Sequence, residues 1–339
     1  MGLLRAAYFT ALFGASWKII HGPMVLKSQA YKAHGPVLQS AACFAKPGFE
    51  HYPWLGPKLD QINCVLNSIF ISSNESPAAV LFMKTFGAVF FCTVLMSTYE
   101  GFRPQYRRAN VVTGTLARAS SFFLLLGQLI AAGCSTPLQM IFSALSSGDG
   151  PVAPPAAEYI WTALVATLVT FNGTFAHVVS TNWSYRALSI WQPFPVYTCA
   201  LALVLPPILR AVGLGHKHTR IPAIVIIAAL GTAASVQGHV ALVKGTVLDP
   251  NGLDIKDVFL VNPAPLLAPL SYGAHLLFVW DFVFVTATVA SLVVFTSGSL
   301  VALVPIVGIS ALAGPGAGLI IPWAVREINA SHAAANKKA

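Results

Sequence analysis

Two acidic residues lie in or beside strongly apolar stretches of this chain, and they are its first candidates for chemistry. Asp281 lies within residues 275–297 (HLLFVWDFVFVTATVASLVVFTS), a stretch long enough to cross a bilayer as a helix. Glu100 follows the apolar stretch 77–98, in the sequence TYEGFRP. A carboxylate inside a membrane costs a few kcal/mol or more, so it must face protein, water or a proton. A functional site is therefore expected around Asp281.

An acid surrounded by aromatic rings combines two chemical abilities. Apolar surroundings favour the protonated form of a carboxyl group, which can then act as a general acid. Aromatic faces stabilise a developing positive charge. The aromatic residues near the polar positions include Trp280, Phe282, Tyr99 and Phe175. This combination suits protonation of an olefin or an epoxide in a greasy isoprenoid, followed by cyclisation through carbocations.

Three further polar residues within apolar stretches extend the expected site. They are Asn172, His177 and His239. Each also has a structural interpretation, because polar side chains commonly hydrogen-bond between membrane helices. Glu100 has one as well, since it can pair with Arg103 three residues later on the same helix.

The composition identifies the class of protein. The chain has 339 residues, of which 56% are hydrophobic and 9% charged, whereas soluble domains carry about 25% charged residues. This predicts a single all-α domain over 1–339, a polytopic transmembrane bundle. The net charge of +9 is interpreted as membrane topology rather than as a site for nucleic acid. The five cysteines form no CxxC pair, and no metal site or cofactor is expected.

About eight spans are expected from the apolar stretches. The connection 22–76 is expected to be extramembrane or interfacial, with a short interfacial helix over 60–73, and residues 325–339 form a polar tail. The predicted spans are 3–21, 77–98, 113–133, 159–180, 193–213, 221–243, 275–297 and 300–324.

The basic residues suggest an orientation. Arg103, Arg107 and Arg108 place the loop after the second span in the cytoplasm. If all eight spans cross, the connection 244–272 is cytoplasmic too, and both acids share one leaflet with the three polar residues above. The basic loop 214–220 disagrees, because it falls on the opposite side.

The chain resembles the fungal integral-membrane terpene cyclases of meroterpenoid pathways, especially those of the ascochlorin and ascofuranone type. The likeness rests on overall size, the number of spans and the acid pair, Glu100 in TYEGFRP and Asp281 in VWDFVF. It extends more distantly to the pyripyropene type, shorter cyclases in which one membrane glutamate and one membrane aspartate perform the proton chemistry. This chain differs from those by an extra N-terminal region and an eighth span.

The resemblance implies a metal-independent cyclase acting on a farnesyl-type meroterpenoid in the endoplasmic reticulum membrane. Asp281 would donate the proton, and Glu100 would accept the final proton or hold the donor in place. His177, His239 and Asn172 would support the two acids.

Two other classes of function remain open from the residues alone. A small-molecule transporter would also explain buried polar groups and a kinked last span. Another membrane lipid enzyme, such as a sterol isomerase or a prenyltransferase, is the second. A prenyltransferase would need magnesium, for which the residues Asn251, Asp254 and Asp257 offer one weak candidate.

Overall fold

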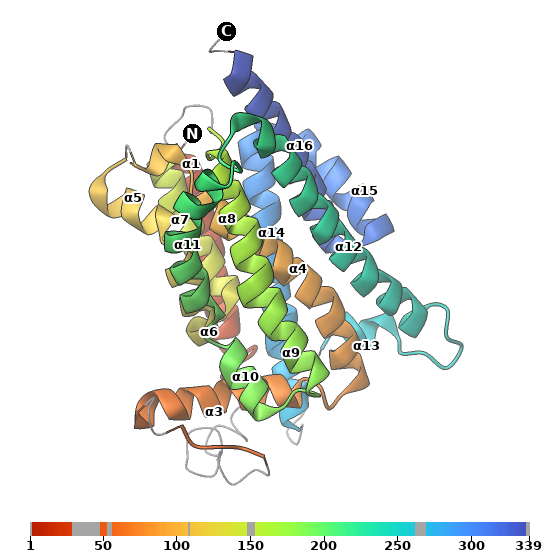
Figure 1. Ribbon diagram of the computed structural model, residues 1–339. Coiled ribbons are helices and arrows are strands. Elements are labelled where there is room, and N and C mark those ends of the chain that lie inside the picture. Colours follow the sequence, from red (N-terminus) through yellow and green to blue (C-terminus); the bar gives the residue numbers. More distant parts are fainter. Residues whose placement is uncertain are drawn as a thin grey trace.

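The computed structural model describes residues 2–28, 48–52, 56–107, 109–147, 153–261 and 269–336. Every regular element among them is a helix, which confirms the predicted all-α class (Figure 1). Parts of the predicted connection 22–76 and tail 325–339, together with Arg108, lie outside these residues.

The described helices vary greatly in length, from a single turn to 28 residues. In chain order they are α1 (Gly2–Ile20), α3 (Pro57–Ser72), α4 (Pro77–Gly101), η3 (Pro104–Arg107), α5 (Val111–Arg118), α6 (Ser120–Ile130), α7 (Ala132–Ser147), α8 (Ala157–Thr167), η4 (Leu168–Gly173), α9 (Thr174–Ser180), α10 (Tyr185–Trp191), α11 (Phe194–Ala211), η5 (Lys217–Thr219), α12 (Arg220–Thr246), α13 (Ile255–Phe259), α14 (Leu270–Ser297), η6 (Leu300–Ala302), α15 (Leu303–Ala313) and α16 (Pro315–Asn336).

Five helical segments of the described chain are long and apolar enough to cross a membrane, which marks an integral membrane protein. The predicted number of eight is not confirmed. The five segments are Pro77–Gly101, Ala157–Ser180, Tyr185–Ala211, Lys217–Thr246 and Leu270–Ser297.

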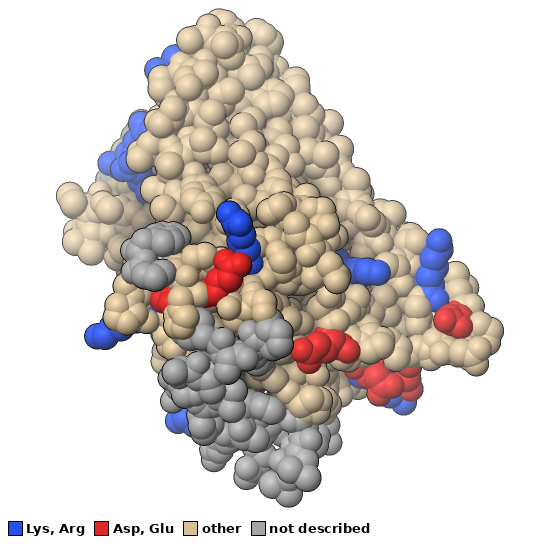
Figure 2. Space-filling view, turned by 60° about the horizontal axis from the view of Figure 1, so that its bottom comes forward, with Lys and Arg blue, Asp and Glu red and all other residues tan. Residues whose placement is uncertain are grey.

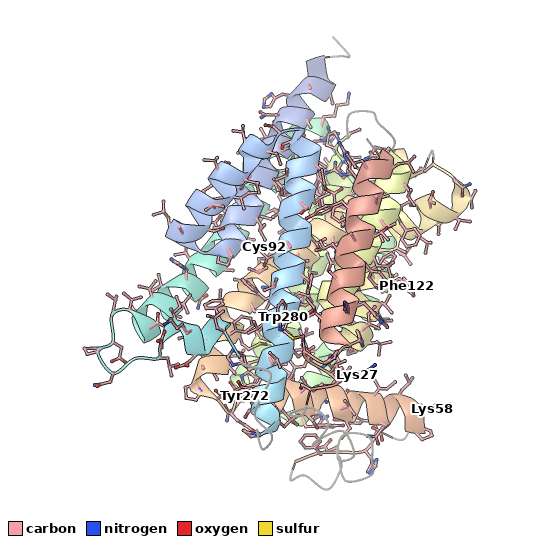
Figure 3. All side chains as sticks on the ribbon, turned by 180° about the vertical axis from the view of Figure 1, so that it is seen from behind. Lys27, Lys58, Cys92, Phe122, Tyr272 and Trp280 are labelled. Atoms are coloured by element: carbon pink, nitrogen blue, oxygen red, sulfur yellow. The ribbon has the colours of Figure 1, made fainter. Side chains whose placement is uncertain are left out.

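The bundle has two distinct ends. Helix α3 lies across one of them, as expected for an interfacial helix, and we call this the α3 end (Figure 1). We call the opposite end, where Arg103, Arg107, Arg118 and Arg210 lie, the arginine end. Figure 3 shows from behind that Lys27, Lys58 and Tyr272 belong to the α3 end, and that α1 lies beside α14.

The predicted span 113–133 does not cross the bundle. It is divided between α5 and α6, and α6 ends where Ala131 adopts a positive φ of 73°. Helix α7 then turns back and packs against α6. Both helices reach the arginine end, because Ser120 at the start of α6 faces Gly101 and Ser147 at the end of α7 lies in a small cleft with Glu100.

The predicted span 300–324 is also a hairpin rather than a crossing. Gly314, at φ 86°, joins α15 to α16. The two helices approach closely, since a Cβ on Gly318 would lie 1.9 Å from Ser310 Oγ. Helix α16 returns to the arginine end, where Glu327 contacts Arg103. The prolines and glycines that predicted a kink therefore accompany a complete reversal of the chain.

Because 113–133 forms a hairpin, the later spans run opposite to the expected direction. The eight-span topology requires α4 and α14 to be antiparallel, and this expectation is wrong. They run parallel: the ring centroids of Phe82 and His275 lie 5.4 Å apart, and those of Phe86 and Phe278 lie 5.9 Å apart. The two acids consequently lie at different levels of the bundle.

The observed direction of the later spans also removes the disagreement between the basic loop 214–220 and the predicted orientation. The loop 214–220 lies at the arginine end, whereas the described residues 247–261 of the next connection lie at the α3 end, with α13 beside α4. Figure 2 turns the α3 end toward the viewer and shows acidic side chains across it. Cys64 on α3 is disulfide-bonded, which is typical of an oxidising compartment. The basic residues of loop 214–220 thus lie at the same end of the bundle as Arg103 and Arg107, as the positive-inside rule expects of loops that share one side of a membrane.

A buried ion cluster fastens α4 to α16 at the arginine end. Arg103 is fully buried and pairs with Glu100, three residues earlier, and with Glu327 at 2.7 Å. Tyr99 donates a hydrogen bond of 2.5 Å to Glu327, and Arg326 pairs with the same carboxylate. Burial alone lowers the pKa of Arg103, but the two carboxylates outweigh it and hold the pKa above its ordinary value. The structural interpretation of Glu100 is thus the one observed.

Removing the central cation should destabilise the protein strongly. Arg103→Met leaves two buried carboxylates without their main partner, a change that typically costs about 3–5 kcal/mol. The free energy of unfolding in mixed detergent micelles measures this loss. Lys217→Met, an exposed cation at the same end, should change it by no more than about 0.5 kcal/mol. Equal effects of the two substitutions would contradict the cluster's role.

Candidate functional site

Asp281 is buried on α14 and faces the break between α6 and α7. Its Oδ1 accepts a hydrogen bond from the backbone N–H of Gly133, and the N–H of Ala132 also faces the carboxyl group. N–H groups in the first turn of a helix have no acceptor within that helix. A carboxyl group at this place satisfies them and interacts favourably with the positive end of the helix dipole.

His21 satisfies the other side of the same break. Its Nε2 lies 3.0 Å from the carbonyl oxygen of Ile130, the last residue of α6. Because a carbonyl oxygen only accepts, we assign the hydrogen to Nε2, which leaves Nδ1 as the basic atom of the neutral ring. The ring stacks on Trp17 with 4.1 Å between centroids. His21, directly after the end of α1, and Asp281, in the middle of α14, therefore hydrogen-bond to the two sides of the turn between α6 and α7.

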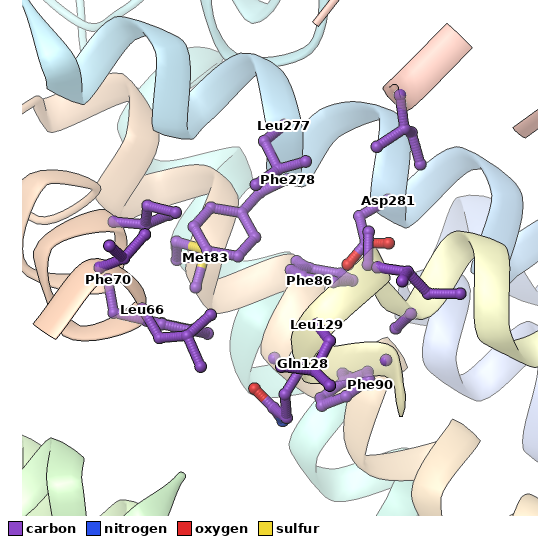
Figure 4. A pocket seen from close by; sticks show the side chains of 18 of the residues that line it. Leu66, Phe70, Met83, Phe86, Phe90, Gln128, Leu129, Leu277, Phe278 and Asp281 are labelled. Atoms are coloured by element: carbon purple, nitrogen blue, oxygen red, sulfur yellow. The ribbon is translucent and has the colours of Figure 1, made fainter. Parts of the chain in front are cut away.

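A cavity of about 710 Å³ opens beside this break. Asp281, His21 and Gln128 line it among mainly apolar residues. In Figure 4, Asp281 lies at one end of the labelled side chains and Phe70 with Leu66, both from α3, at the other. The cavity thus offers an apolar space with a carboxyl group at one end.

Aromatic rings from six helical segments form the walls of the cavity. The short π-helical segment η4 and the start of α9 supply two of them, Phe171 and Phe175, whose rings are parallel with centroids 6.1 Å apart. Trp191 connects this pair to α3, because its ring lies 5.1 Å from that of Phe70. The aromatic lining residues are Phe70, Phe86, Phe90, Phe171, Phe175, Trp191 and Phe278.

Among the residues predicted from sequence, Asp281 and Phe175 line this cavity. Trp280 and Phe282, the neighbours of Asp281, instead pack on other faces of α14. Trp280 stacks against Phe284 at 6.1 Å, and Phe282 meets Phe82 edge-on at 5.6 Å. Adjacent residues on a helix point in different directions, and both neighbours of Asp281 face away from the cavity that Asp281 lines.

The predicted acid pair is not brought together. Glu100 and Tyr99 belong to the ion cluster at the arginine end. Phe90, the lining residue of α4 nearest to them in sequence, precedes Glu100 by ten residues, or roughly 15 Å of helix. The two acids were expected at one level of the bundle because the eight-span topology makes α4 and α14 antiparallel. Since the two helices run parallel, Glu100 and Asp281 lie at different levels.

The three remaining predicted residues also lie apart from the cavity lining. His177 is exposed near the end of α9. His239 on α12 lies against Gly314, at the turn of the second hairpin. Asn172 is partly buried in η4, and its side-chain oxygen has no hydrogen-bond partner among the described residues.

One of the possible magnesium residues has a local structural role. Asp254 caps the short helix α13, where its Oδ1 accepts the N–H of Lys256 at 2.9 Å. Within the described ranges, no three His, Cys, Asp or Glu residues are grouped so that they could hold a metal ion.

The sequence interpretation missed His21 and the backbone of residues 131–133. His21 directly follows the first apolar stretch, so its position at the end of a helix was the available signal. The backbone break had none, because Ala131 is neither glycine nor proline. Comparisons with protein-family models, with curated proteins and with solved structures found no match. The site is therefore interpreted from its own geometry.

Replacing Gly133, beside the cavity, and Gly87, in its lining, with alanine should have different effects on thermal stability. A Cβ on Gly133 would lie 2.9 Å from Phe284 Cβ and 3.0 Å from Asp281 Oδ1, whereas a Cβ on Gly87 would meet no atom within 4 Å. Gly133→Ala should lower the unfolding temperature, because the hairpin turn must move away from Asp281. Gly87→Ala should leave it unchanged or raise it, since alanine favours helix by about 1 kcal/mol. Thermal unfolding in detergent measures both; a stable Gly133→Ala variant would contradict the described contact.

Proposed function

We propose that this protein is a membrane-bound terpene cyclase, which protonates an epoxide or an olefin of a farnesyl-type meroterpenoid and cyclises it through carbocations. The observation that carries the proposal is the carboxyl group of Asp281 at one end of an aromatic-walled cavity. Its volume of about 710 Å³ lies within the range of about 300–1,000 Å³ typical of small-molecule sites. The endoplasmic reticulum is proposed as its membrane on the ground of the resemblance alone.

Asp281 is proposed to transfer its proton to the epoxide oxygen or to the terminal double bond. The carbon–oxygen bond breaks, or the alkene becomes a cation, and an internal double bond then attacks the cationic carbon. The N–H groups of Ala132 and Gly133 stabilise the carboxylate that the proton leaves behind. Stabilisation that grows as charge develops lowers the barrier to protonation.

The aromatic walls supply the second requirement of this reaction. A carbocation moving along the chain needs a negative potential without a nucleophile, and the faces of Phe, Tyr and Trp rings provide it. Phe86, Phe90 and Phe171 lie along the proposed path. His21 is the basic side chain among the lining residues, and we assign it the final proton in place of Glu100, which lies in the ion cluster.

Asp281→Asn should abolish cyclisation without unfolding the protein. The amide oxygen of asparagine still accepts the N–H of Gly133, but the side chain has no acidic proton to give. Loss of a general acid typically lowers a rate by about 10²–10⁴-fold. Membranes containing either protein would receive an epoxyfarnesyl-phenol, and mass spectrometry would detect cyclised isomers of unchanged mass.

The control is Asp257→Asn, which changes an exposed acid at the α3 end and should retain full activity. Conversion by an equally abundant Asp281→Asn variant would contradict the role of Asp281. No conversion by the wild-type protein would contradict the cyclase. Cyclisation by the wild-type protein that survives chelation of magnesium would exclude a magnesium-dependent prenyltransferase.

A small-molecule transporter is the second candidate, and the two hairpins favour it. Transporters bind substrates where helices are discontinuous near the middle of the membrane. Both Ala131 and Gly314 interrupt helices in this way. Substrate uptake into liposomes by the wild-type protein, without change of the substrate's structure, would favour this function over cyclisation.

A further inference from the structure

A second hollow of the molecule lies at the arginine end, away from Asp281. It is a groove of about 540 Å³ between the α5–α6 junction and α11. Arg107, Arg118 and Arg210 line it, together with Ser120 and Ser121 at the start of α6. No acidic residue is among the described residues that line it. Its polar half is therefore suited to an anion.

The positive charge of the groove is only partly neutralised. Arg210 pairs with the buried Glu158 at 2.6 Å. Arg107 donates to the hydroxyl of Tyr159 at 3.0 Å and lies over its ring at 5.4 Å, a neutral partner. Arg118 is exposed and forms no ion pair within the described chain. Two of the three cations thus remain without a carboxylate.

The start of α6 adds a second attraction for negative charge. This helix of 11 residues has Ala119 at its N-cap, so no side chain satisfies its first N–H groups. Residues 119–122 all line the groove. Unsatisfied N–H groups at a helix N-terminus favour phosphate, and the helix dipole acts in the same direction.

The other half of the groove is apolar and faces outward. It contains Phe122 from α6 and Leu203 from α11, which are 52% and 76% exposed. From Arg210 the lining continues along α11 through Pro206 to Cys199, a distance of roughly 16 Å at the rise of an α-helix. A ligand that fits both halves has an anionic head and a hydrocarbon chain lying against the bundle.

We propose that this groove binds an anionic phospholipid of the leaflet at the arginine end. The phosphate lies among Arg107, Arg118 and the start of α6, and one acyl chain follows α11 toward Cys199. A zwitterionic phospholipid carries the same phosphate and matches the apolar half equally well, but the cation of its headgroup is repelled by the arginines, so its net attraction to the cationic half is weaker. The proposal is independent of the cyclase, because it involves no residue of the Asp281 cavity.

The test is native mass spectrometry of the full chain in detergent, with phosphatidylserine and phosphatidylcholine carrying identical acyl chains. The wild-type protein should retain phosphatidylserine in preference to phosphatidylcholine. Arg107→Gln and Arg118→Gln should each lower phosphatidylserine occupancy about fivefold, as expected for one basic residue near an anionic lipid. Arg186→Gln, an exposed cation on α10 at the α3 end, should leave it unchanged.

Three outcomes would overturn the proposal. The first is equal retention of the two lipids by the wild-type protein, which requires no variant to fold. The second is an Arg186→Gln effect as large as those of the groove variants. The third is displacement of phosphatidylserine by millimolar glycerophosphoserine, its soluble headgroup, because the groove would then be a site for a soluble phosphate.

Discussion

An interrupted helix inside an apolar bundle must find partners for its exposed backbone groups, and this constraint organises the molecule. No water is present to accept or donate these hydrogen bonds, and each unsatisfied group costs several kcal/mol. At Ala131 the two sides of the break are served by different helices, the N–H groups of α7 by Asp281 and the carbonyl of α6 by His21. The hairpin of α6 and α7 ends partway through the bundle, and α3 covers the space between this hairpin and the α3 end. The cavity is the consequence.

The arginine end has a different structural role, which is to fix the positions of the helices relative to one another. Both hairpins enter the bundle from this end, so the helices there need a fixed arrangement. The cluster of Arg103, Glu100 and Glu327 fixes α4 against α16, and Arg326 extends it to Thr296 on α14. The paired charges of this cluster neutralise one another, and none of the cluster residues lines the Asp281 cavity. The described chain therefore separates the ionic contacts that position its helices from Asp281, a buried acid for which no ion pair is observed among the described residues.

The sequence predicted the helical class, the five long apolar segments and a protein environment around Asp281, because these depend on local composition and on the cost of a buried charge. It did not predict the topology. The stretch 113–133 has the length and hydropathy of a span, and the turn falls at an alanine, a residue type that does not indicate a turn. One missed reversal inverted every later span and led to the expectation that Glu100 and Asp281 share one leaflet. The pair Glu100 and Arg103 was predictable, since their spacing of three residues is local.

Asp281 has a structural role and a proposed chemical role, and the two roles require different properties of its side chain. Satisfying the N–H of Gly133 requires only an acceptor oxygen, which asparagine or glutamine also provides. A carboxyl group adds an exchangeable proton, at the expense of a group that is costly to bury. If the turn at Ala131 needed nothing but an acceptor, a neutral amide would serve it at lower cost. The presence of an acid at the wall of an aromatic cavity therefore supports the proposed proton transfer.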